Sequence, residues 1–401
     1  MSAGSTAEST LKVPGVRLGA TGAGIKRTDR DDLLVIELAA GGTMAAVFTR
    51  NAFCAAPVTV AREHLGQAPR WLLINSGNAN AGTGARGLDD ARDSCRRLAA
   101  LVDGAETQVL PFSTGVIGEY LPLDKITTAL PDAVVALDEL GWERAARAIM
   151  TTDTRPKIAS RELDVGGRSV RLAGIAKGAG MIHPDMATML SFVATDAAVE
   201  EVALQQLLNE AVDRSFNCIT VDGDTSTNDA CVLMASGHSA ALAPGAPGWE
   251  SFRQAVLEVC SELAEAIIRD GEGATKLIRI AVEGACDRAE ALAVGKTIAH
   301  SPLVKTAFFA SDPNWGRILA AIGRAGCPEL DIGGVTVSLG EVVIVEGGGR
   351  AAGYTEAAGQ VEMAKPEITV GVRLGRGGAS AEVLTCDFSY DYVRINAEYR
   401  T

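Results

Sequence analysis

The sequence predicts a mixed α/β protein in which sheets and helices pack in layers. Hydrophobic residues make up 47% of the 401 residues, enough for a large core, while only 4% are aromatic. Short apolar stretches of strand length alternate with amphipathic stretches of helix length, and their order does not follow a regular strand–helix–strand series. The length indicates two or three domains, or one large layered domain.

The first part of the chain is predicted to alternate between strands and helices. After a polar tail of about 13 residues, the apolar stretches LLVIELA, MAAVFT and APVTVA alternate with Gly- and Asp-rich turns, as strands do. WLLINS, which begins at Trp71, is another expected strand. Residues 87–102 repeat apolar side chains every three or four positions, which predicts an amphipathic helix. TQVLPFSTGVIG indicates a strand that breaks into a tight turn, and helical patterning returns at 124–149.

The second part is predicted to continue the same mixture. Residues 158–175 alternate loosely as strands do, and MLSFVATDA is apolar and prone to form a strand. Helices are expected at 196–215 and 249–269, with the strand DACVLMASG between them. SDPNWGRILAAIGRAG predicts a loop entering a helix, with Asp312 or Asn314 as its cap. The remainder is predicted to form short strands and Gly turns and to end in a Tyr-rich strand, YDYVRINAEY.

Charge and cysteine usage narrow the class of protein. The formal net charge of −13 argues against nucleic acid or an anionic membrane surface as the main partner. The cysteines contain no C-x-x-C pair, which indicates reduced, mostly buried thiols. The start lacks an apolar signal core, and no apolar run approaches the roughly 18 residues of a membrane span. We therefore expect a soluble cytoplasmic protein.

The segment AKGAGMIHPDMATML, residues 176–190, carries the most chemical information. Its glycines allow unusual backbone conformations, and the small Ala187 precedes Thr188 at the start of an expected strand. Attack of the Thr188 hydroxyl on the Ala187 carbonyl would form an ester, and water would then release the upstream chain. Thr188 would gain a free α-amine of pKa about 7.7–8.0, which can serve as the base for its own hydroxyl. By themselves, these residues are more typical of a Gly-rich loop that leads into a core strand.

KGAGMIHPDMATML is similar to the signature around the self-cleavage site of ornithine acetyltransferases, which recycle acetyl groups in arginine biosynthesis. Further stretches resemble the family over nearly the whole chain. They are VPGVRLGATGAGIKRTDRDDLLVIEL, VFTRNAFCAAPV, STGVIG, TTDTRPK, TVDGDTSTND, SDPNWGRI and INAEYRT. The resemblance implies a layered α/β fold of the self-processing, N-terminal-nucleophile-like (DOM) type. It also implies cleavage into fragments 1–187 and 188–401, assembled as a heterotetramer of two copies of each.

The resemblance also assigns site residues. Thr188 is implied as the nucleophile, and Thr114 and Gly115 as the oxyanion hole. Substrate-binding roles are implied for Thr151, Lys177, Thr188, Glu272, Asn396 and Thr401. Lys177 would bind the substrate's α-carboxylate and Glu272 the side-chain amine of ornithine. Thr152 is the alternative to Thr151 if the segment up to Lys177 differs in length from that of relatives.

Each of these residues also has a more ordinary interpretation. A Thr-Gly turn is usually only a turn, a lysine is usually exposed, a carboxylate between glycines is usually solvated, and chain ends usually fray. The histidines at 64, 183, 238 and 300 lack metal-ligand spacing, and His183 is expected to be a loop residue. Asp222, Asp224 and Asp229 lack EF-hand spacing and are expected to form structural turns. GGGRAAG at 347–353 is expected to be a turn, because no GK[ST] follows.

The implied reaction is a ping-pong acetyl transfer. Thr188 would take the acetyl group of N2-acetyl-L-ornithine and pass it to L-glutamate, without a metal or a tightly held cofactor. Acetyl-CoA is a possible second donor, on which the sequence does not decide. Three alternatives stay open: a self-cleaving hydrolase that passes the acyl group to water, a family member with other acyl acceptors, and an inactive binding or scaffold protein.

Overall fold

The computed structural model describes residues 11–183 and 189–398. Most of the expected N-terminal tail, residues 1–10, lies outside the described residues. The chain divides into two compact units, each described here by itself. Unit 1 contains the residues up to 178 together with 184–217 and 225–264. Unit 2 contains 179–183, 218–224 and the chain from 265 onward.

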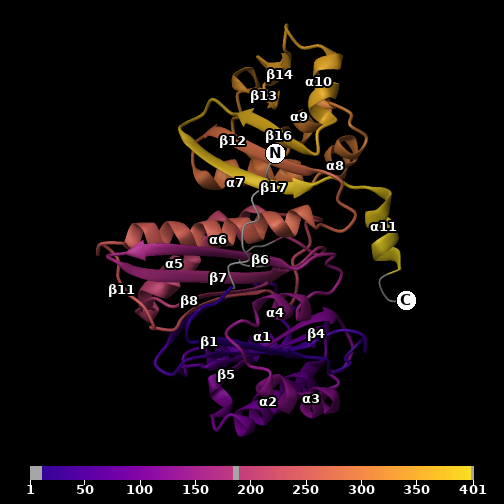
Figure 1. The fold of residues 1–401 in the computed structure, drawn as a ribbon. Coiled ribbons are helices and arrows are strands. Elements are labelled where there is room, and N and C mark those ends of the chain that lie inside the picture. The colour runs from indigo at the N-terminus through magenta and orange to yellow at the C-terminus, as the bar shows by residue number, and fades with distance from the viewer. Residues whose placement is uncertain (1–10, 184–188, 399–401) are drawn as a thin grey trace, which may run out of the picture. The chain divides into compact units, whose positions relative to one another are not determined.

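Unit 1 consists of two stacked sheets with helices on both outer faces (Figure 1). The strands are β1 (Val16–Thr21), β2 (Leu33–Leu38), β3 (Thr43–Phe48), β4 (Trp71–Asn78), β5 (Val109–Val116), β6 (Lys157–Val165), β7 (Arg168–Lys177), β8 (Leu190–Thr195), β9 (Ala198–Val199), β10 (Ala230–Ala235) and β11 (Ala241–Leu242). The helices are α1 (Ala56–His64), α2 (Gly84–Leu101), α3 (Leu123–Val135), α4 (Trp142–Ala148), α5 (Glu201–Arg214) and α6 (Trp249–Arg269), which passes into unit 2 after residue 264. The predicted layered α/β class is thus confirmed.

The core of unit 1 lies between its two large sheets. The first sheet has the order β1-β2-β4-β5 and the second the order β3-β10-β8-β7-β6. Small and aliphatic side chains such as Ile74, Ile175 and Val232 fill the space between them, together with Phe112 and Phe192. The outer face of the first sheet packs on apolar residues of α1, α2 and α3. Burial on both faces explains why the central strands are almost continuously apolar in sequence.

Two strand pairs in unit 1 position the residues predicted for catalysis. β4 and β5 run parallel, with Ser76 opposite Thr114 and Gly77 opposite Gly115. β7 runs antiparallel to β8, with Lys177 opposite Leu190. These pairs lie in different sheets. The ends of β5 and β7 nevertheless meet, because Lys177 contacts Thr114.

Unit 2 is built on one six-stranded sheet with the order β15-β14-β13-β16-β12-β17. Its strands are β12 (Leu277–Ala285), β13 (Thr336–Leu339), β14 (Val342–Glu346), β15 (Gly349–Arg350), β16 (Glu367–Arg373) and β17 (Ala379–Cys386). Its helices are α7 (Arg288–Ala299), α8 (Pro302–Phe309), α9 (Trp315–Gly323), α10 (Glu356–Met363) and α11 (Tyr390–Ala397). A single apolar cluster joins this sheet to α7, α8 and α9. The predicted cap is Asn314, whose side chain accepts a hydrogen bond from the Arg317 backbone N–H.

Two stretches that were expected to be strands are helices, and α10 lies in the part of the chain that was expected to form only short strands and Gly turns. APVTVA was expected to be a strand but forms most of α1, which has Pro57 in its first turn, where a missing N–H is tolerated. YDYVRINAEY was expected to be a strand, but residues 390–397 form α11, which begins where the Ser389 side chain accepts the Asp391 N–H. In both segments β-branched or aromatic residues favour a strand, and a helix-start signal overrides them.

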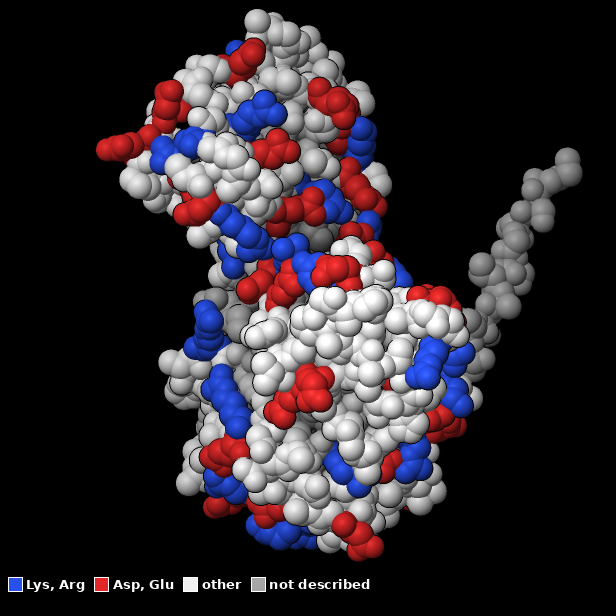
Figure 2. All heavy atoms as spheres, turned by 90° about the vertical axis from the view of Figure 1, so that its left-hand side faces the viewer, with Lys and Arg blue, Asp and Glu red and all other residues white. Residues whose placement is uncertain are grey.

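Charged side chains of both signs are interspersed on the face shown in Figure 2. Many form local ion pairs. In unit 1, Arg161 contacts Glu258 at 3.1 Å and Glu262 at 2.9 Å. In unit 2, Arg269 contacts Glu367 at 2.7 Å. Exposed pairs of this kind contribute roughly 0–1 kcal/mol each, so the stability of each unit rests on its apolar core.

The cysteines and helices agree with two simpler expectations. All eight cysteines are free, and five of them are buried, as the absence of paired spacing predicted. Among the residues that the structure describes, no helix combines the length and the apolar character that crossing a bilayer requires.

Candidate active site

The predicted oxyanion pair lies at the end of β5, where the strand turns sharply. Gly115 has a φ of +135°, a conformation that residues with a side chain rarely adopt. A Cβ atom on Gly115 would lie 2.3 Å from the backbone carbon of Gly77 on β4, so only glycine fits this close approach. Thr114 is 8% exposed. Both residues lie within β5, and the turn predicted from STGVIG follows after Val116.

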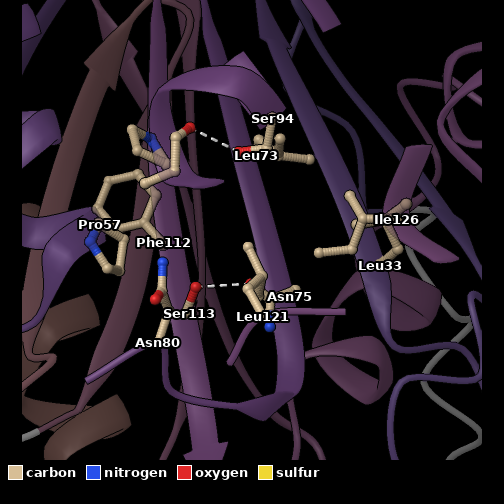
Figure 3. A pocket seen from close by; sticks show the side chains of 12 residues that line it. Leu33, Pro57, Leu73, Asn75, Asn80, Ser94, Phe112, Ser113, Leu121 and Ile126 are labelled. Carbon is tan, nitrogen blue, oxygen red and sulfur yellow. Dashed lines mark hydrogen bonds between the residues drawn. The ribbon is translucent and has the colours of Figure 1, made fainter. Parts of the chain in front are cut away.

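Buried amide side chains form hydrogen bonds with the backbone and side chains around the predicted oxyanion pair. Figure 3 shows one of these bonds, between Ser113 and Asn75. Ser113 donates its hydroxyl hydrogen to Asn75 Oδ1 at 2.6 Å, and Asn75 donates to the carbonyl of Asn78 at 2.8 Å. Asn228 donates to the carbonyl of Ser113 at 2.9 Å and to that of Ala79. A small cavity beside Asn75 and Ser113 has room for about one water molecule. The loop that follows β4 and the strand that carries Thr114 are thus linked by hydrogen bonds in a buried setting, where such bonds restrict movement most.

Lys177, at the end of β7, contacts the predicted oxyanion residue directly. Its Nζ donates a hydrogen bond to Thr114 Oγ1 at 3.0 Å. A hydroxyl that accepts a bond keeps its own hydrogen available to donate. The contact therefore places a cation and a hydroxyl donor side by side, and both favour negative charge on a bound molecule.

Thr151 is linked to the same end of β7 by Asp153, which accepts hydrogen bonds from both segments. The Thr151 N–H donates to Asp153 Oδ2 at 3.0 Å, and the Gly178 N–H donates to Asp153 Oδ1 at 2.7 Å. Burial acts to raise the pKa of Asp153, but Lys177, Lys157 and the Gly178 N–H outweigh it and lower that pKa to about 2. Asp153 is thus ionised although its side chain is inaccessible.

Two other predicted substrate residues lie together in unit 2. Asn396, on α11, donates from Nδ2 to Glu272 Oε2 at 2.8 Å. Glu272 is only 8% exposed, and its backbone N–H donates to the carbonyl of Ala179. Its carboxylate packs on Gly180, where a Cβ would come within 2.3 Å of Oε2. Glu272 is therefore a buried and oriented carboxylate, unlike the solvated one that its sequence setting usually indicates.

The acidic run TVDGDTSTND forms structural turns, as expected, but its members differ. In unit 2, Asp222 accepts the backbone N–H groups of Met181 and Ile182 at 2.6 and 2.9 Å, and burial raises its pKa. In unit 1, Asp229 precedes β10, and burial raises its pKa well above the ordinary value. His183 follows the segment held by Asp222 and contacts the carbonyl of Gly223 through Nδ1 at 3.1 Å. His183 is thus a loop residue, as predicted.

Three predicted site residues lie outside the described residues. They are Ala187 and Thr188, at the expected cleavage point, and Thr401 at the chain end. The predicted site residues that the structure describes therefore fall into two separate groups, Thr114, Gly115, Lys177 and Thr151 in unit 1, and Glu272 with Asn396 in unit 2.

Comparison with known proteins shows to which family the chain belongs. The family model described as "ArgJ family" matches residues 17–401. The chain belongs to the ArgJ family. It is 69% identical over 391 residues to the arginine biosynthesis bifunctional protein ArgJ of Methylococcus capsulatus, covering 97% of this chain and 96% of that protein. The ArgJ of Pseudomonas fluorescens is 54% identical over 392 residues, covering 97% of each.

A solved ArgJ-family structure agrees with this assignment. The ArgJ of Bacillus halodurans is 44% identical, with a TM-score of 0.50, and the match covers 52% of this chain and 99% of that one. The resemblance drawn from the motifs is thus confirmed, and so is the predicted class, an acyltransferase of arginine biosynthesis.

Sequence reasoning missed the residues that support the ArgJ-family site. Asp153 and Lys157 lie inside the quoted motif TTDTRPK, and Asn75 and Asn228 inside other polar runs, but none was singled out. A buried charge or amide is revealed by its partners, which come from distant parts of the chain. A local signal was present only for Asn75, a polar amide inside the apolar strand β4.

Gly180→Ala tests whether the position of Glu272 matters in this ArgJ-family chain. The added methyl group would displace the Glu272 carboxylate and weaken its bond to Asn396. We expect KM for the acetylated ornithine substrate to rise about tenfold or more, since small misplacements near a site have large effects. Steady-state kinetics would measure this, with Gly353→Ala as the control, because a Cβ there meets open space. An unchanged KM would separate Glu272 from substrate binding.

His300 should make unit 2 sensitive to acid. Burial, and then the nearby charges of His183, Lys296, Lys305 and Arg324, lower the pKa of His300 to about 3. The unfolded chain protonates this histidine below about pH 6.5 while the folded chain does not, so stability falls as the pH drops through that value. Between pH 7 and 5 the loss should be about 1–2 kcal/mol. Thermal unfolding at both pH values should show a smaller change in stability for His300→Gln than for wild type. An equal change in both proteins would contradict the lowered pKa of His300.

Proposed function

We propose that this chain transfers the acetyl group of N2-acetyl-L-ornithine to L-glutamate through an acetyl ester on Thr188. The Thr188 hydroxyl would attack the acetyl carbonyl while its own α-amine accepts the proton. The amide C–N bond then breaks, ornithine leaves with the proton on its amine, and the acetyl group stays on the threonine oxygen. The amine of glutamate then attacks the ester and restores the hydroxyl.

The contact between Lys177 and Thr114 carries this proposal. It joins a cation suited to an amino-acid carboxylate to a hydroxyl suited to a developing oxyanion. Donor and acceptor substrates share an α-carboxylate and an α-nitrogen, so one set of anchors can serve both half-reactions. Further substrate contacts are proposed for Thr151, Glu272, Asn396 and Thr401, with Glu272 suited to the side-chain amine of ornithine.

The proposed cleavage between Ala187 and Thr188 is compatible with a stable product. The second sheet of unit 1 combines β3, β6 and β7 from fragment 1–187 with β8 and β10 from fragment 188–401. Cutting the connection between β7 and β8 would leave their hydrogen-bonded ladder in place.

Four further features are proposed. The fragments assemble as a heterotetramer of two copies of each. No metal or tightly held cofactor takes part. Acetyl-CoA serves as a second donor, a proposal supported by the word "bifunctional" in the names of the relatives. The site of action is the cytoplasm, where reduced thiols such as the eight free cysteines persist.

Mass spectrometry and an acetyl-transfer assay test the proposed function together. The purified protein should give two fragments that begin at residue 1 or 2 and at Thr188. With acetylated ornithine and glutamate it should produce acetylglutamate, and without glutamate the reaction should stop after one acetyl group per site. Steady release of acetate in buffer alone would identify a hydrolase, and faster transfer to another amine would identify a different acceptor. Labelled acetyl-CoA with glutamate tests the second donor.

A further inference from the structure

We propose that Asp153 is a positioning residue for the amino-acid substrate: it fixes Lys177 and Thr151, and Lys157 keeps it ionised. The inference rests on the proposed function, because it assigns a task to residues beside two proposed substrate contacts. Asp153 is not itself proposed to touch substrate.

One carboxylate joins three segments of unit 1. Asp153 Oδ1 accepts hydrogen bonds from Lys157 Nζ at 2.5 Å and from the Gly178 N–H at 2.7 Å. Its Oδ2 accepts the Thr151 N–H at 3.0 Å. The loop after α4, the start of β6 and the residue that follows β7 are thereby held at a single point. Any movement of Asp153 would shift the backbone at Thr151 and directly after Lys177.

The charges around Asp153 favour an anionic ligand. Its side chain is 0% exposed and that of Lys157 is 1% exposed, so this is a fully buried ion pair. Lys177 is close enough to stabilise the same carboxylate and also donates to Thr114. A bound α-carboxylate would pair with the Lys177 cation, which lies at the end of this group nearest the oxyanion residue Thr114.

A purely structural role explains this arrangement less well. Buried ion pairs give little net stability compared with apolar side chains of similar size, because removing both charges from water is unfavourable. The ion pair of Asp153 and Lys157 lies beside Thr151 and Lys177, the two proposed substrate contacts of unit 1, and Asp153 bonds to the backbone at Thr151 and directly after Lys177. Orientation of binding groups is a task for which such a buried network is suited.

The test replaces both charges at once. Asp153→Asn alone would remove the charge that Asp153 places beside the buried Lys157 cation, so the informative variant is Asp153→Asn combined with Lys157→Met. We expect this double variant to fold and to raise KM for acetylated ornithine and for glutamate by about tenfold, with kcat changing less. Introduced into Lys177→Met, the same two changes should raise KM by a clearly smaller factor, because the part of their effect that passes through Lys177 is already lost and only the part that passes through Thr151 remains.

Leu130→Ala, a core change in α3, is the control for general destabilisation, since Leu130 is fully buried in a separate cluster. It should lower the thermal midpoint without changing KM. A double variant that loses stability while both KM values stay within about twofold of wild type would make Asp153 purely structural. Additive effects with Lys177→Met would also overturn the proposal. Failure of the proposed function is distinguishable, because wild type itself would then transfer no acetyl group.

Discussion

Thr188→Ala is expected to leave the chain uncut and to lower acetyl transfer by more than about 10⁴-fold, because both reactions use the same hydroxyl. Wild type should separate into two fragments on a denaturing gel, whereas the variant should migrate as one chain of 41.5 kDa. The remaining activity should come only from substrate binding and oxyanion stabilisation, because the variant lacks both the nucleophile and the free α-amine that serves as its base.

Thr188→Ser is the matched control, because it keeps the hydroxyl and removes only a methyl group. It should still be cut and should retain measurable transfer. Wild type that migrates as a single full-length chain, or a Thr188→Ala variant that transfers acetyl groups at a normal rate, would exclude Thr188 as the catalyst.

Much of the fold could be predicted because burial leaves a direct trace in the sequence. Strands such as β4 and β8 are apolar along their whole length and are bounded by small polar residues. Prediction failed where local signals conflict. In α11 the run of tyrosine, valine and isoleucine favours a strand, but the segment begins with Ser389, whose side chain accepts the Asp391 N–H and starts a helix.

The site could be predicted in part, and the limit is physical. Motifs identified Thr114, Gly115 and Lys177, and the structure joins Lys177 to Thr114. A contact between residues of two different sheets, such as that of Lys177 with Thr114, depends on how the sheets stack. No local sequence pattern encodes that stacking. For the same reason the tight packing of Glu272 on Gly180 could not be foreseen, since one residue follows β7 and the other follows α6.

Gly115→Ala should produce the second-largest effect, a fall in kcat of about 100- to 1,000-fold, as expected when an oxyanion donor is lost. Two independent constraints act at this position. The φ of +135° is unfavourable for alanine, and the new Cβ would lie 2.3 Å from the Gly77 backbone carbon and 2.6 Å from the Asn78 nitrogen. Backbone atoms cannot rotate away as side chains can, so β4 and β5 must separate and the Gly115 N–H must change direction. Stability should fall by roughly 1–3 kcal/mol.

Gly118→Ala distinguishes these two constraints. Gly118 lies in the bend that follows β5 and has a φ of +86°, but a Cβ there meets no heavy atom within 4 Å. Gly118→Ala should therefore lose less stability, through backbone strain alone, and should keep most of its kcat. Thermal unfolding and steady-state kinetics on the two variants separate the effects. If activity fell equally in both, strain in the turn would explain the loss, and Gly115 would have no special part in stabilising the oxyanion.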